Sequence, residues 1–266
     1  MNPQSLMLSC FGIHALGHDK ALATGGLIEL FGRAGVGEDA VRSTLTRMVG
    51  RGLLERHRVG RKTYFGITPR AAAVLQDGHD RVWHTGAVNR AWDGTWTLVG
   101  FSLPEAWRRE RHDLRSRLVW GGFGLLQNGL WVAPGAVDVP ALVEGLGLDD
   151  HLNVFRGAAA TGPTDARAVL ESAFDVDAIA KGYRSFLERW SGPLPAPETE
   201  GDLARQLLLH TDWLELVRTD PHLPAEHLPE NWPAAGAEEL FRTLAERYEA
   251  PARAEAGLLL DAIPVP

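Results

Sequence analysis

The chain has 266 residues, of which 45% are hydrophobic and 23% charged, with 27 basic against 34 acidic side chains. This is the composition of an ordinary soluble protein with room for two or three small domains. The single cysteine, Cys10, excludes an internal disulfide framework, and no apolar run approaches the length of a membrane span. Because no signal-type segment opens the chain, we expect a cytoplasmic protein.

The first elements expected along the chain are helices. Apolar residues at helical spacing predict one helix over residues 5–16 and another over residues 22–31. Cys10 lies in the first of these and is expected to pack as a small core residue. The two helices would precede a third, which begins after Gly37.

The third helix has defined ends and two distinct faces. Gly37 is an acceptable N-cap, and Gly52 can supply the left-handed residue after the last turn. One stripe is apolar and consists of Val41, Leu45, Met48 and Val49. The opposite face therefore presents Arg42, Ser43, Thr46 and Arg47. Guanidinium and hydroxyl groups together are what DNA base edges and phosphates require.

Two strands joined by a basic turn follow this helix. Residues 53–58 and 63–68 are rich in strand-forming side chains, and residues 59–62 form the turn between them. Together, the three helices, the two strands and the basic turn predict a winged helix-turn-helix. Seven basic residues stand against one acidic residue between positions 42 and 62, although the protein as a whole is acidic. The alternative is a solvated basic face. We predict that DNA is bound by Arg42, Ser43, Thr46, Arg47, Arg51, Arg58, Arg61 and Lys62.

The order of elements in the middle of the chain predicts a ferredoxin-like domain. Thr68 and Pro69 begin a helix over about residues 70–83 that leads out of the winged helix. The pattern then alternates as βαββαβ. Its members are a strand at 96–103, a helix at 105–120, strands near 123–125 and at 130–134, a helix at 140–146 and a strand at 151–155.

The last third is helical in pattern, and a proline-rich stretch over residues 192–197 interrupts it as a stiff linker. We therefore predict an α+β multidomain protein in three parts. The parts are a winged-helix DNA-binding domain (1–82), a linker with a ferredoxin-like βαββαβ domain (83–165) and a mostly helical domain (166–266).

Enzyme motifs are missing from the sequence. We find no Walker-type glycine loop, dinucleotide fingerprint or nucleophile elbow. The run Gly121–Gly124 has no lysine and is most simply a bend before a strand. A group of tail residues, His210, Asp212, His222 and His227, matches no compact ligand spacing. We expect no metal, no cofactor and no enzymatic activity.

With these three parts in view, the chain resembles the phenylacetate-catabolism repressor family, the PaaX-like regulators. The resemblance lies in AVRSTLTRMVGRGLLERHRVGRKTYFGITP in the first part, WDGTWTLVGFSLPE and GGFGLLQNGLWVAP in the second and RTDPHLPAEHLPENWPA in the third. One departure is Gly37, where the family leads us to expect serine. Since glycine is also accepted as an N-cap, the departure should cost little.

The resemblance implies a homodimeric repressor that binds palindromic operators and releases them when an aryl-CoA thioester such as phenylacetyl-CoA binds. Such an effector needs cations for its phosphates and an aromatic pocket for its acyl group. Arginines and tryptophans occur close together in sequence in the middle part. Alternatively, these arginines form a solvated face and these tryptophans pack in the core. The effector-binding candidates are Trp107, Arg108, Arg111, Arg115, Trp120 and Trp131.

Two other functions stay open at this stage. The middle part also resembles small CRISPR-associated ferredoxin-like nucleases, whose first strand ends in an acidic residue thought to hold a metal. Ser102 stands at that position, and a hydroxyl is a poor substitute for a carboxylate at a hard divalent cation. A nucleic-acid-processing enzyme is therefore an alternative to the repressor, and an effector-independent DNA-binding protein is another.

Overall fold

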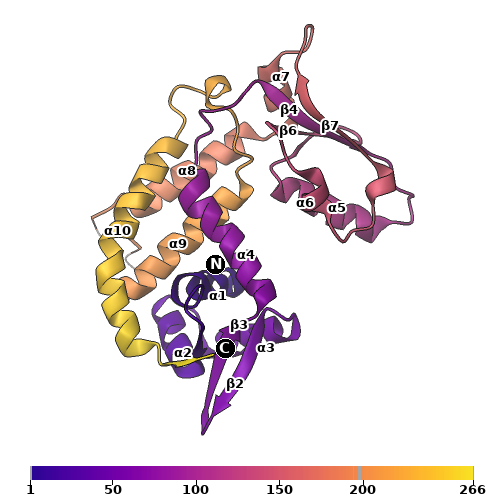
Figure 1. The fold of residues 1–266 in the computed structure, drawn as a ribbon. Helices are drawn as coiled ribbons and strands as arrows, with labels where there is room; N and C mark the ends of the chain where they lie inside the picture. The colour runs from indigo at the N-terminus through magenta and orange to yellow at the C-terminus, as the bar shows by residue number, and fades with distance from the viewer. Residues whose placement is uncertain (1, 194, 197–198, 266) are drawn as a thin grey trace. The chain divides into compact units, whose positions relative to one another are not determined.

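A computed structural model describes residues 2–193, 195, 196 and 199–265 (Figure 1). The chain forms two compact units. The first, here called the winged-helix unit, combines residues 1–85, 185–215 and 236–266; the second, the central unit, combines residues 86–184 and 216–235. The expected linker over residues 192–197 falls partly on positions 194 and 197, which lie outside the described residues.

The first part of the chain folds as the predicted winged helix. Its elements are α1 (Pro3–His14), β1 (Lys20–Ala23), α2 (Thr24–Arg33), α3 (Glu38–Gly50), β2 (Leu54–Val59) and β3 (Lys62–Ile67). These strands and β8 (Ala262–Pro264) form a sheet in the order β2-β3-β1-β8. Cys10 is fully buried, as predicted, and burial raises the pKa of its thiol to about 12. The thiol therefore behaves as a small core group.

The sequence assigned Leu22 to a helix, and this is wrong. Leu22 lies in β1, paired antiparallel with Phe65 of β3, and the helix begins only at Thr24. Helical and extended placements would both bury this leucine, so its apolar character does not distinguish them. The backbone hydrogen bonds offered by the neighbouring strands favour the extended form.

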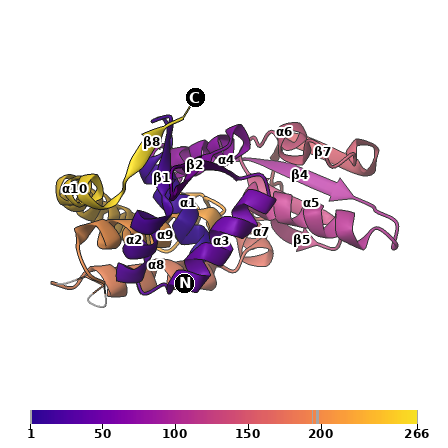
Figure 2. The same ribbon diagram turned by 90° about the horizontal axis from the view of Figure 1, so that it is seen from below.

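The C-terminus adds a strand that the sequence did not predict. After the long helix α10 (Ala234–Leu259), β8 (Ala262–Pro264) pairs antiparallel with β1, Ala21 lying opposite Ile263. Figure 2 shows this yellow strand beside the indigo β1. The chain reaches it by passing directly over Gly26 of α2. A Cβ atom at Gly26 would lie 2.4 Å from the carbonyl oxygen of Leu259, so only glycine allows this approach.

Replacing Gly26 by alanine should therefore detach the C-terminal segment from α2. We expect a loss of about 1–3 kcal/mol in the free energy of unfolding, because backbone atoms block the new methyl group. Gly25→Ala is the matched control in the same helix, since its Cβ would meet nothing within 4 Å. That control should be neutral or gain up to about 1 kcal/mol from helix propensity. Urea unfolding of both variants, with hydrogen exchange at β1 and β8, measures the difference. Equal effects would contradict the close approach.

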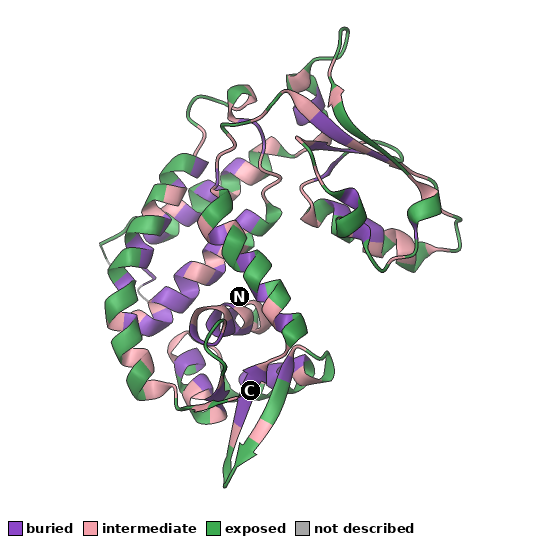
Figure 3. Ribbon diagram, in the orientation of Figure 1, coloured by how far each residue is buried: buried purple, intermediate pink, exposed green. Residues whose placement is uncertain are grey.

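The rest of the winged-helix unit is a set of helices. Thr68 caps α4 (Pro69–Asp80) by accepting from the Ala71 N–H at 3.2 Å, as predicted, and a π-helical turn, η1 (Arg81–Thr85), follows. The two helices α8 (Val176–Trp190) and α9 (Asp202–Thr219) supply residues to both units. Trp213 of α9 stacks on Phe241 of α10, with ring centroids 4.8 Å apart. Figure 3 shows α9 largely purple and α10 with a green outer face, which marks the core between them.

The central unit has the predicted ferredoxin-like order. Its elements are β4 (Thr95–Phe101), α5 (Arg108–Trp120), β5 (Gly124–Gln127), β6 (Leu130–Pro134), α6 (Val139–Val143), η2 (Asp149–His151), β7 (Leu152–Ala159), α7 (Ala166–Ala173) and η3 (Ala225–His227). The sheet is antiparallel, in the order β5-β6-β4-β7. Leu114 and Leu118 of α5 pack against Val99 and Trp131 on one sheet face. Leu170 of α7 belongs to a separate cluster with Trp96.

Candidate nucleic-acid interface

Helix α3 presents the two faces that the sequence predicted. Val41, Leu45 and Met48 are buried, while Val49 is half-buried. All four predicted DNA-binding residues of the helix, Arg42, Ser43, Thr46 and Arg47, are exposed. Gly37 occupies the N-cap, and Gly52 takes φ +67° after the last turn. The N–H of Leu53 donates to the Met48 carbonyl at 3.0 Å, which completes a Schellman ending.

The polar groups on the exposed face of α3 bond within their own helix. The guanidinium of Arg42 contacts the Glu38 carboxylate, with Nε to Oε1 at 2.7 Å. Ser43 and Thr46 donate their hydroxyls to carbonyls one turn back, and Arg47 Nη2 donates to Thr44 Oγ1 at 3.1 Å. Exposed pairs of this kind are worth little. These side chains can therefore exchange partners for DNA at small cost.

The β2–β3 hairpin forms a short basic wing (Figure 1). Val59 pairs with Lys62, which leaves Gly60 and Arg61 as a two-residue loop, and Gly60 adopts φ +59°. Both Arg58 and Arg61 are exposed. The third predicted wing cation, Lys62, is also exposed, but its Nζ donates to Asp261 Oδ2 at 2.7 Å. The sequence offered no signal for this partner, because 199 positions separate the two residues.

Two further arginines near the wing, Arg51 and Arg56, have partners within the protein. Arg51, a predicted DNA-binding residue, donates from Nη1 to Gln4 Oε1 at 3.0 Å and so joins the start of α1 to the end of α3. Arg56, which the prediction left out, lies over the ring of Phe65 at 5.7 Å. Arg56 and Arg58 are two positions apart on β2, so both side chains lie on the same face of the strand. This spacing could have been recognised in the sequence.

The predicted effector-binding residues do not gather into one pocket. Trp107 and Trp120 stand at opposite ends of α5, a separation of about 20 Å at 1.5 Å per helical residue. Trp107 packs against His151 at 5.0 Å, whereas Trp120 lies under the guanidinium of Arg218 at 5.0 Å. Trp131 is 6% exposed in the core. All three tryptophan rings pack against other side chains of the central unit.

The three predicted arginines of α5 also differ in their contacts. Arg111 Nη2 donates to the carbonyl oxygens of Leu103 at 2.9 Å and Pro104 at 3.1 Å, so it holds the loop that follows β4. Arg108 and Arg115 are exposed one turn to either side. These two guanidiniums are the members of the predicted row that face solvent.

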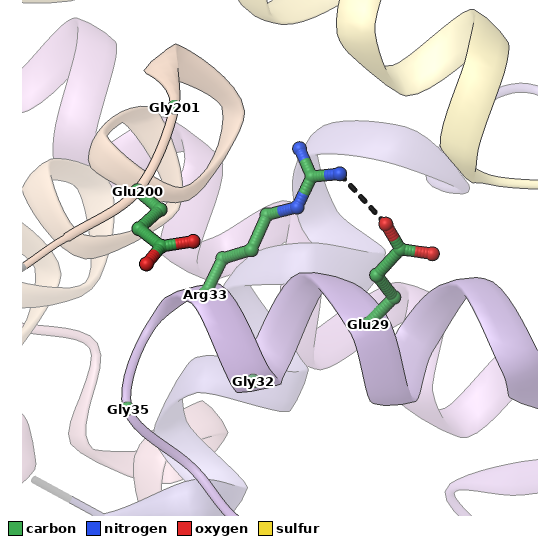
Figure 4. A pocket seen from close by; sticks show the side chains of 6 residues that line it. All are labelled: Glu29, Gly32, Arg33, Gly35, Glu200 and Gly201. Carbon is green, nitrogen blue, oxygen red and sulfur yellow. Dashed lines mark hydrogen bonds and ion pairs between the residues drawn. The ribbon is translucent and has the colours of Figure 1, made fainter.

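A pocket of about 590 Å³ lies elsewhere in the winged-helix unit (Figure 4). It is lined by Glu29, Gly32, Arg33, Gly35, Glu200 and Gly201. The guanidinium of Arg33 points to Glu29, with Nη2 to Oε1 at 2.7 Å, and Glu200 approaches from the opposite loop. None of the residues predicted to bind DNA or an effector lines this pocket.

The histidines of the tail belong to different units. His210 packs against the rings of Trp83 and Phe241 in the winged-helix unit, while His227 packs on Trp92 in the central unit. Asp212 accepts from the indole of Trp190 at 3.0 Å. Within the described residues, no group of three or more His, Cys, Asp or Glu is arranged to hold a metal ion. No helix in the described part of the chain is long and apolar enough to cross a bilayer.

Comparisons with known proteins match the chain to three family models in consecutive segments. Residues 2–71 match the family described as PaaX-like protein, residues 89–169 the PaaX protein central Cas2-like domain and residues 174–256 the PaaX-like protein C-terminal domain. The chain is 27% identical over 255 residues to the transcriptional repressor PaaX of Escherichia coli (strain K12). The aligned region covers 91% of this chain and 79% of that protein. The uncharacterized protein Rv0674 from Mycobacterium tuberculosis shares the fold, with a TM-score of 0.62 and 22% identity over 96% of this chain and 98% of that one.

Proposed function

We infer that this chain, which belongs to the PaaX-like family, is a transcriptional regulator that binds double-stranded DNA through its winged helix. The observation that carries the inference is the exposed face of α3, where two arginines and two hydroxyl residues share one surface beside a basic wing. Arginine can bond guanine in a bidentate manner, and hydroxyls can bond bases or phosphates of either strand. The relative in Escherichia coli is a transcriptional repressor, which supports repression as the output.

A homodimer on a palindromic operator is the form of binding that we propose. One recognition helix offers few base contacts, and twofold symmetry doubles them. The family resemblance supports release by an aryl-CoA thioester in a cytoplasmic setting. Of the predicted effector residues, Arg108 and Arg115 are the ones that keep exposed guanidiniums for phosphate groups. We therefore propose that the effector's phosphates bind along this face of α5.

The test begins by mapping the DNA that the protein protects upstream of its neighbouring genes. Affinity for that site is then measured with phenylacetyl-CoA, free CoA and phenylacetate, for wild type and for Arg108→Ala with Arg115→Ala. We expect the thioester alone to weaken binding, since a ligand releases DNA only by preferring the DNA-incompetent form. Incubation of the same DNA with Mg²⁺ or Mn²⁺ tests the nuclease alternative. Cleavage lost on Ser102→Ala would favour that alternative.

Neutralising the wing should reduce the salt dependence of DNA binding. We expect Arg58→Ala and Arg61→Ala each to lower the slope of log affinity against log salt by about 0.9, because each removes one phosphate contact. Fluorescence anisotropy on a random-sequence duplex between about 50 and 200 mM salt measures the slope. Arg167→Ala on α7, an exposed arginine of the central unit, is the matched control. An unchanged slope in both wing variants would exclude the hairpin from the interface.

A further inference from the structure

Asp261 stands at the junction between the last helix and the wing. It follows α10 and directly precedes β8. Its Oδ2 accepts from Lys62 Nζ at 2.7 Å and from Tyr64 Oη at 3.1 Å, and both donors lie on β3 of the wing. These two hydrogen bonds, that of Lys62 foremost, hold the pKa of the Asp261 carboxyl below its usual range. A negative charge from the far end of the sequence therefore lies beside Lys62 of the wing.

The backbone fixes this carboxylate in place. The N–H of Ala23 donates to the Asp261 carbonyl at 2.8 Å, and β8 pairs with β1 immediately afterwards. On the other side, the close approach of Leu259 to Gly26 fixes the path from α10. Ile263 packs on the small cluster that contains Tyr64. The carboxylate consequently has a defined position, unlike that of a free surface acid.

The pair with Lys62 is exposed to solvent. The side chain of Lys62 is 66% exposed and that of Asp261 46%. An exposed ion pair contributes little to stability. Its larger effect falls on the DNA affinity of the wing, because a lysine paired with a carboxylate releases fewer counterions on meeting a phosphate. The neighbouring Arg58 and Arg61 have no such acidic partner among the described contacts.

We propose that Asp261 is a positioning residue that holds Lys62 away from the DNA backbone and thereby limits the affinity of the wing. The proposal rests on the proposed function, since it requires that the hairpin meet DNA. Because β8 is covalently continuous with α10, a displacement of α10 would withdraw Asp261 and free Lys62. The C-terminal strand thus links the last helix to the strength of DNA binding.

The test is a double-mutant cycle on the full chain with a random-sequence duplex. Asp261→Asn keeps an acceptor for Tyr64 and nearly the same shape. It should raise affinity about 3- to 10-fold near 100 mM salt and steepen the salt slope by about 0.9, since one more cation becomes free for phosphate. In a Lys62→Gln background, Asp261→Asn should have no such effect. Conversely, Lys62→Gln should cost little alone and about 3- to 10-fold in the Asp261→Asn background, so that the cycle closes.

Two control variants separate the charge from other effects. Glu246→Gln on the exposed face of α10 makes the same change in net charge away from the wing and should leave the slope unchanged. Tyr64→Phe removes the second hydrogen bond but leaves the Lys62 pair, so its slope should stay that of wild type. Hydrogen exchange at β1 reports whether β8 remains paired in each variant.

The outcomes distinguish this inference from the proposed function. One outcome is that wild type binds DNA with a measurable salt slope, but Asp261→Asn leaves that slope unchanged or changes it by the same amount in the Lys62→Gln background. In that case the proposed role of Asp261 is wrong, while DNA binding by the protein stands. Weaker binding by Asp261→Asn would also overturn the proposal. If wild type and all variants fail to bind any duplex, the proposed function fails and this inference fails with it.

Discussion

Lowering the pH from about 7.5 to about 5 is expected to destabilise the winged-helix unit by about 4 kcal/mol through His14, which is buried, and His210, which is half-buried. Burial is the main cause that lowers the pKa of His14 and of His210 from 6.5 to about 4. Lys20 and then His18 add to this effect at His14, and His14 and His79 add to it at His210. His210 packs against the rings of Trp83 and Phe241, and the Nε2 of His14 is buried.

The direction of the effect comes from proton binding. Between pH 6.5 and about 4 the unfolded chain protonates these histidines, whereas the native state keeps them neutral. The native state is therefore fully favoured above pH 6.5 and loses stability as the pH falls towards 4. At pH 5 the difference amounts to about 2 kcal/mol for each histidine.

Urea unfolding with hydrogen exchange at α1 and α9 measures this loss in the relevant unit. His210→Gln cannot titrate, so its stability should fall by only about half as much between the two pH values. His112→Gln, an exposed position on α5, is the control and should keep the full dependence. If His210→Gln retained the wild-type dependence, His210 would not be the group responsible.

Replacing Arg42 or Arg47 by alanine is expected to weaken operator binding by about 1–3 kcal/mol, or about 5- to 150-fold, if each contacts a base. Both side chains are exposed on α3, and the helix offers them no apolar surface to cover. The pair between Arg42 and Glu38 is exposed on both sides, with 57% and 55% of the side chains accessible. Breaking it therefore costs little against a bond to guanine.

The comparison of operator with random-sequence DNA decides between base and phosphate contacts. Loss of a base contact should lower operator affinity far more than random-DNA affinity. Glu38→Gln is a useful companion, because it releases Arg42 and should leave operator affinity at least as high as wild type. Arg253→Ala on α10 serves as the charge control. Equal losses on both duplexes would assign these arginines to phosphate instead.

The exposed basic face of α3 was predictable because its signals are local. The spacing of Val41, Leu45 and Met48 determines which face of α3 is buried, and Gly37 and Gly52 determine where the helix ends. The βαββαβ order was predictable for the same reason, since each strand and helix lies in one continuous stretch. Neither conclusion depends on a partner from a distant part of the chain.

The proposed effector site shows where sequence reasoning stops. Residues that are neighbours in sequence suggested one pocket, but a helix of 13 residues separates Trp107 from Trp120, and Arg111 bonds to the loop before α5. Proximity in sequence does not determine which way side chains point once a helix packs on a sheet. That choice follows from the core, where Leu114 and Leu118 take the inner face of α5.

By itself, the sequence determined the winged helix, the ferredoxin-like order and the exposed basic face of α3, because periodicity and capping act within a few residues. Only the tertiary structure decided that Leu22 belongs to a strand, that β8 completes the wing sheet and that Asp261 meets Lys62. A strand of three residues has no periodicity to detect, and its stability comes from backbone hydrogen bonds to β1. Such bonds exist only after the chain has folded, when positions 199 residues apart lie in contact.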